Sequence, residues 1–222
     1  MRALLARLRF SLTLMTERRT VMFAILDALF VLAGLVIAFN SGDSAAEFYV
    51  PMFIMPALLI GVPILADAVA IERRSGTIDL AMTSPGAHTY FERRVASVAA
   101  LLVVQGWLGV LVARIAGEPF PVSGPMLQIV IAAGFLCSVA LNWTVRVRTT
   151  GAVVFAVYAT IIAFSPWFFS NPVHPPGYRG QGPMRIPDYI SYFKTNLVLA
   201  LAGVIFYLYA RQRLSRPETI IT

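Results

Sequence analysis

Residues that could carry out covalent or metal chemistry are few in this chain. There are two histidines, His88 and His174, and the topology expected below places them on opposite sides of a membrane. Serine, histidine and aspartate do not form a recognisable nucleophile motif. The single cysteine, Cys137, lies in an apolar run and excludes an intrachain disulfide or a cysteine-rich metal site. We therefore predict no catalytic residues, no metal ligands and no cofactor bound by this chain.

Two carboxylates stand out because they interrupt apolar runs. A central aspartate costs about 2.5–3.5 kcal/mol to insert, so Asp27 and Asp67 are expected to face protein or a watery cavity. Pro56 and Pro63 precede Asp67 in the same run and would free backbone carbonyls there. We expect these four residues to belong to a transport pathway. The alternatives are that Asp67 only reaches water and that Asp27 pairs with a polar group.

The longest polar interruption near the middle of the chain spans residues 66–94. It predicts a short helix that begins at Thr77, a suitable N-cap, and carries Asp79 in its first turn. Ile78, Ala81 and Met82 would share one face, and Ser84-Pro85-Gly86 would end the helix. A small helix with an apolar face between two membrane spans is typical of a docking element.

Composition places the chain in a membrane. Hydrophobic residues make up 58%, charged residues only 13%, and the mean hydropathy is +0.75. A net charge of +7 would suggest nucleic acid in a soluble protein. Here the basic residues lie at the ends of apolar runs, so we interpret them as a topology signal and expect no nucleic-acid partner.

The apolar runs predict an all-α integral membrane protein with a single transmembrane domain. Residues 1–17 form an amphipathic pattern typical of an interfacial helix, with a signal peptide as the alternative. Gly106 and Gly109, in the third run, would permit close helix contact. Residues 72–94 and 170–195 are the expected cytoplasmic and external connections, and Ile186 to Lys194 could form a short helix. The six expected spans are about 21–39, 48–71, 95–116, 125–145, 150–169 and 196–209.

The distribution of basic residues orients these spans. With six spans, 14 of the 18 lysines and arginines fall on one side and 4 on the other. The positive-inside rule then places both termini and residues 72–94 in the cytoplasm. A model with five or seven spans would scatter the arginines over both sides.

The polar segment resembles the cytoplasmic coupling motif of type-2 ABC exporter permeases. The resemblance rests on Glu72-Arg73, Gly76-Thr77-Ile78-Asp79 and Thr83-Ser84-Pro85, with Asp79 where glutamate is usual and Arg93 or Arg94 where lysine is common. It implies a type-2 exporter fold in the cytoplasmic (inner) membrane. It also implies that these residues dock on a partner ATPase. The implied coupling residues are Glu72, Arg73, Gly76, Thr77, Ile78, Asp79, Met82 and Pro85.

The resemblance also implies partners. No nucleotide-binding loop of the form G-x-x-x-x-G-K-S/T occurs, so ATP and Mg²⁺ would be bound by a separate ATPase subunit, and this chain would not be an enzyme. The family pairs two permease subunits, so a homodimer or heterodimer is expected. The alternatives are a haem-exporter B-like subunit of cytochrome c maturation, and a membrane anchor or intramembrane enzyme. The mostly aliphatic and aromatic span faces favour lipidic or hydrophobic cargo.

Overall fold

The computed structural model describes residues 53–67, 87–115, 122–169 and 186–216, together with part of 25–36. All regular structure in these residues is helical, which agrees with the all-α prediction. The expected interfacial helix 1–17 lies outside the described residues, as do residues 68–86 and most of the external segment. The predictions for these stretches stay predictions.

The helices follow the apolar runs of the sequence. A helical stretch through residues 53–67 contains the π-helix η3 (Ala57–Gly61). It is followed by α6 (Ala87–Ile115), α7 (Ser123–Thr144), α8 (Thr150–Ala163), α9 (Ser165–Phe168) and α10 (Ile186–Leu214).

In the part of the chain that the structure describes, three helices are long and apolar enough to cross a membrane. They contain the candidate spans Thr89–Val112, Ser123–Thr144 and Ile190–Leu214, and two shorter apolar helices cover Ala57–Asp67 and Thr150–Ala163. A bilayer core needs about 20 apolar residues in a helix, so these lengths fit a multi-pass membrane protein. The number of spans and the side on which each terminus lies stay predictions.

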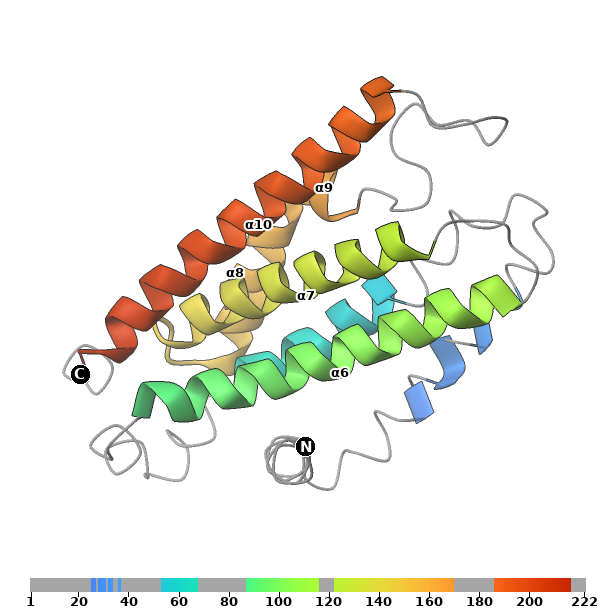
Figure 1. The fold of residues 1–222 in the computed structure, drawn as a ribbon. Coiled ribbons are helices and arrows are strands. Elements are labelled where there is room, and N and C mark those ends of the chain that lie inside the picture. The colour runs from blue at the N-terminus through green and yellow to red at the C-terminus, as the bar shows by residue number, and fades with distance from the viewer. Residues whose placement is uncertain are drawn as a thin grey trace.

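Helix α7 lies at the centre of the molecule and packs against α6, α8 and α10 (Figure 1). Gly106 permits the close contact with α6, as the sequence predicts, because an added Cβ would lie 2.8 Å from Cγ2 of Ile129. Gly203 does the same on α10, where an added Cβ would lie 3.3 Å from the Cα of Phe135. Small residues at helix contacts let backbones approach closely, which increases van der Waals packing.

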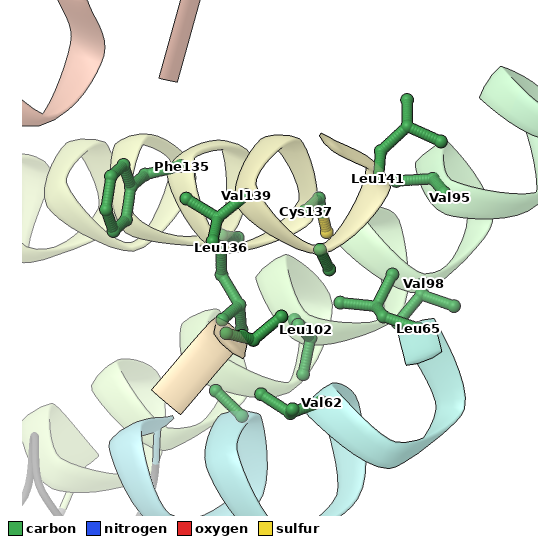
Figure 2. Close-up of a cluster of buried hydrophobic side chains, with 14 of the residues drawn as sticks. Val62, Leu65, Val95, Val98, Leu102, Phe135, Leu136, Cys137, Val139 and Leu141 are labelled. Carbon is green, nitrogen blue, oxygen red and sulfur yellow. The ribbon is translucent and has the colours of Figure 1, made fainter. Parts of the chain in front are cut away.

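One part of the buried core forms where the 53–67 stretch, α6 and α7 meet (Figure 2), and α8, α9 and α10 contribute further buried residues. Val62 and Leu65 come from the 53–67 stretch, Val98 and Leu102 from α6, and Leu136 from α7. All five are almost fully buried. Cys137 is also buried in this core and unbridged, as expected for a cysteine whose role is packing.

Two helices begin earlier in the chain than the apolar runs from which they were predicted. Helix α6 begins at Ala87 and not near residue 95, and its polar first turns bury Phe91 and Arg94. Helix α10 begins at Ile186, so the short helix expected at 186–194 and the run from 196 are one continuous helix. The run 150–169 is divided at Phe164 into α8 and α9, just before Pro166, whose missing N–H cannot continue an α-helical ladder.

Candidate functional site

The residues of the predicted docking motif fall outside the described part of the chain. This holds for all eight, namely Glu72, Arg73, Gly76, Thr77, Ile78, Asp79, Met82 and Pro85. It also holds for Asp27. Pro56, Pro63 and Asp67 are described, as are the helix that leads away from the motif and its neighbours. The site can therefore be built from the elements that flank the motif.

Pro56 and Pro63 flank a widened helical turn. Pro56 lies directly before the π-helix Ala57–Gly61, and at its far end the Val62 N–H donates to the Ala57 carbonyl, five residues back. In a π-helix each carbonyl accepts from the N–H five residues further on, so the Leu58 carbonyl would accept from residue 63. Residue 63 is a proline and has no N–H.

A side chain from another helix supplies the missing donor. The hydroxyl of Tyr158, on α8, donates to the Leu58 carbonyl oxygen at 2.7 Å. An unpaired carbonyl in an apolar interior costs about 1–3 kcal/mol, so this hydrogen bond offsets the loss of the backbone donor at Pro63. The proline-bearing helix is thereby attached to α8 at the level of its π-turn.

Asp67 provides a second attachment between the same two elements. The hydroxyl of Thr150, at the start of α8, donates to Asp67 Oδ1 at 3.1 Å. Asp67 is partly exposed, so its carboxylate combines access to solvent with a protein partner. Of the four residues expected in a pathway, Pro56, Pro63 and Asp67 lie on one helical stretch. Asp67 contacts α8 directly, and Pro63 leaves the Leu58 carbonyl to accept from α8.

Glu92 joins the first turns of α6 to the last turns of α10. The Tyr207 hydroxyl donates to Glu92 Oε1 at 2.9 Å, and Arg211 Nε lies 3.9 Å from the same oxygen. Tyr207 and Arg211 are four residues apart and so share one face of α10. The Tyr207–Glu92 hydrogen bond has an ordinary donor–acceptor distance. The Arg211–Glu92 ion pair is long, and its arginine is 58% exposed, so the hydrogen bond contributes more to the stability of this contact.

Arg94, one turn from Tyr90, is an unusual buried cation at the start of α6. Its side chain is only 3% exposed, and its guanidinium carbon lies 4.8 Å from the centroid of the Tyr90 ring. Stacking on an aromatic face stabilises such a cation by about 0.5–2 kcal/mol, depending on how far it is desolvated. The first turns of α6 are thus fixed by packing as well as by Glu92.

Arginines gather at this end of the molecule. The first turns of α6 and the last turns of α7 and α10 lie together in Figure 1, and seven of the nine described lysines and arginines are at or just beyond these turns. They are Arg93, Arg94, Arg146, Arg148, Arg211, Arg213 and Arg216. The other two, Arg114 and Lys194, lie toward the opposite end.

The opposite end of the α7–α10 contact is polar but uncharged. The Tyr192 hydroxyl donates to the Gly124 carbonyl at 2.6 Å, and Asn196 Nδ2 donates to the Tyr192 carbonyl at 3.0 Å. The contact between Gly203 and Phe135 has the same sequence offset, 68 residues, as that between Tyr192 and Gly124. This offset places Asn196 level with Gln128 on the parallel helix α7, and both side chains are buried.

No arrangement typical of catalysis occurs in the described residues. They hold no group of three His, Cys, Asp or Glu side chains that could bind a metal ion. The polar contacts instead join helices at defined levels: η3 to α8, α6 to α10, and α7 to α10. Such an arrangement can transmit a rigid-body displacement from one helix to another.

Three of these contacts could not be recognised from the sequence. Thr150, Tyr158 and Tyr207 look like ordinary hydroxyl-bearing residues at the edges or inside apolar runs. The one available signal was an isolated tyrosine in an aliphatic run, since a buried tyrosine hydroxyl usually finds a hydrogen-bond partner.

The comparisons with known proteins give no further assignment. No protein-family model, curated protein or solved structure matches the chain. The functional conclusion therefore depends on the sequence motif and on the geometry of the flanking helices.

Proposed function

We propose that the chain is the permease subunit of an ATP-driven ABC transporter of the type-2 exporter class. It acts as a homodimer or heterodimer in the cytoplasmic membrane and receives force from a separate ATPase through the Thr77–Thr83 helix. That ATPase binds ATP and Mg²⁺. The cargo is lipidic, amphipathic or hydrophobic.

The observation that carries the proposal is the place of α6. It begins at Ala87, directly after the motif that ends at Pro85, and continues without a break to Ile115. Its length exceeds the hydrocarbon thickness of a bilayer, about 30 Å, since each residue adds about 1.5 Å. A displacement of the docking helix would therefore tilt α6 over its full length.

The contacts of Glu92 extend this displacement to a second helix. Because Tyr207 and Arg211 of α10 meet Glu92 in the second turn of α6, a movement of α6 acts on α10 near the same level. The 53–67 stretch, which precedes the motif in the chain, is attached to α8 through Leu58 and Asp67. The helical stretch before the docking segment is therefore attached to α8, and the helix after it, α6, is attached to α10.

The widened turn at η3 supports the assignment to transport. π-turns in α-helices are frequent at functional sites, and irregular backbone in a membrane is tolerated where protein or water satisfies its polar groups. Here Tyr158 satisfies the Leu58 carbonyl. The proline-bearing helix can therefore bend at this level while its backbone stays hydrogen-bonded, as alternating access requires.

Purification of the tagged chain from its own membranes tests the proposal. An ATPase with a nucleotide-binding loop should co-purify with the parent protein and be lost with Ile78→Asp, which inserts equally well. If the parent retains no ATPase after chemical cross-linking in the membrane, the chain is not such a permease.

A further inference from the structure

Among the described residues, the arginine-rich end carries more basic than acidic side chains. In the described part, the carboxylates at this end are Glu92 and Asp67, which meet Tyr207, Arg211 and Thr150. No described carboxylate forms an ion pair with Arg146, Arg148 or Arg213. An excess of this kind attracts an anion.

Arg146 is held in place although its side chain is exposed. Its Nε donates to Oδ1 of Asn142 at 3.0 Å, and Asn142 is only 3% exposed. The guanidinium carbon also lies 5.8 Å from the centroid of the Tyr209 ring on α10. One N–H is thus occupied by a buried amide, while the terminal amino groups stay available for an acceptor that can take two parallel hydrogen bonds.

Arg213 lies beside this position. It follows Tyr209 by one helical turn, so the two share a face of α10, and this face lies on the opposite flank of the α7 contact from Tyr207 and Arg211. The offset between α7 and α10 places Arg213 level with the residues just after the end of α7, where Arg146 stands. Two guanidinium groups from different elements therefore lie at one junction.

We propose that Arg146 and Arg213 bind the phosphate of an anionic phospholipid headgroup at the α7–α10 junction. The position favours a lipid because both arginines stand at the ends of helices that are apolar enough to cross a membrane. The exposed apolar side chains Leu201 and Ile205 precede Tyr209 and Arg213 at intervals of four residues along α10, and they would contact the acyl chains. Basic sites between transmembrane helices are a recurrent form of lipid recognition.

The binding test uses the purified full-length protein in neutral detergent, titrated with phosphatidylglycerol or phosphatidylcholine. Intrinsic fluorescence from the three tryptophans gives the thermal midpoint, and native mass spectrometry counts bound lipid. Phosphatidylglycerol should raise the midpoint and phosphatidylcholine should not. Arg146→Gln and Arg213→Gln should each weaken phosphatidylglycerol binding about five-fold, and Arg146→Lys should lie between Arg146→Gln and the parent.

A matched control removes one positive charge at the other end. Lys194→Gln, on α10, should bind phosphatidylglycerol as the parent does. Equal weakening in Lys194→Gln, parent-like affinity in both arginine variants, or equal stabilisation by phosphatidylcholine would each overturn the proposal. If inorganic phosphate stabilised the protein as much as phosphatidylglycerol does, the site would bind free phosphate and not a lipid headgroup, which would overturn the proposal. Loss of ATPase binding with unchanged lipid affinity would assign the arginines to a protein partner.

A second measurement needs no variant. In the parent protein, phosphatidylglycerol should protect Arg146 and Arg213 from modification by phenylglyoxal, as read by peptide mass spectrometry, while the exposed Arg93 keeps its reactivity. Unchanged modification of Arg146 at saturating lipid would contradict the proposal even if a variant failed to fold.

Discussion

Tyr207 on α10 donates a hydrogen bond to Glu92 on α6 at 2.9 Å, and this contact joins two helices through residues 115 positions apart in the chain. Glu92, the acceptor, lies near the N-terminal end of α6, which directly follows the predicted docking segment. Under the proposed function, the contact stands where a displacement of the docking segment would first reach another helix of the bundle.

Tyr207→Phe should lower the stability of the protein by about 1–3 kcal/mol, because the lost hydrogen bond has a charged acceptor. Thermal unfolding in detergent, combined with Glu92→Gln in a double-mutant cycle, measures the pair. The double variant should be less destabilised than the sum of the single variants. Strict additivity would mean that the two side chains do not interact in solution.

Tyr158→Phe should destabilise the protein by a similar amount, since the Leu58 carbonyl would lose its donor. Pro63→Ala provides a matched rescue because alanine restores the backbone N–H that proline lacks. We expect Tyr158→Phe to cost less in the Pro63→Ala background than in the parent. An equal cost in both backgrounds would show that the hydroxyl does not replace the backbone donor.

Gly106→Ala should destabilise the α6–α7 contact by about 1–3 kcal/mol, because the new methyl group would lie 2.8 Å from Ile129 and 2.9 Å from Phe53. Gly134→Ala is the control, as an added Cβ there meets nothing within 4 Å. Alanine also has the higher helix propensity, so Gly134→Ala should be neutral or slightly stabilising. The same thermal assay compares them, and equal effects would exclude close packing as the cause.

Cysteine labelling tests the predicted topology. In a Cys137→Ala background, a cysteine at Ser44 or Gly180 should react with an impermeant maleimide added outside the cell. A cysteine at Ser75 should react only after the membrane is opened. Outside labelling at Ser75 would contradict the six-span arrangement and the cytoplasmic position of the docking segment.

The helical class and the apolar helices could be predicted from hydropathy alone, but helix ends could not. Hydropathy marks the apolar part of a helix, whereas α6 continues into the polar residues before Val95 because Phe91 and Arg94 pack inside. Likewise α10 begins before its apolar run, and Thr195, the polar residue directly before that run, is buried against the protein.

The side-chain contacts of the candidate site were even harder to predict from the sequence than the helix ends. Pro63 predicted a freed carbonyl, but nothing in one sequence identifies Tyr158, 100 residues away from Leu58, as its partner. Asp67 was a candidate because a carboxylate near hydrocarbon needs a partner, and Thr150 is that partner in the structure. The identity of such partners depends on which helices pack together, and single-residue properties do not encode this.

The most direct test of the proposed function is the affinity of the purified chain for its ATPase after a charge is placed on the docking face. Met82→Asp would bury an uncompensated carboxylate in that contact, at a cost of about 2 kcal/mol or more, which is roughly 30-fold in affinity. Glu72→Ala should show a milder loss. Gly180→Asp, which adds the same charge to the predicted external segment, is the control.

We expect Met82→Asp to reach the membrane in normal amounts and to lose both ATPase binding and substrate-stimulated ATP hydrolysis, while Gly180→Asp keeps both. If Met82→Asp binds the ATPase and transports as well as the parent, the docking helix is assigned wrongly and the chain is not coupled as an ABC exporter permease.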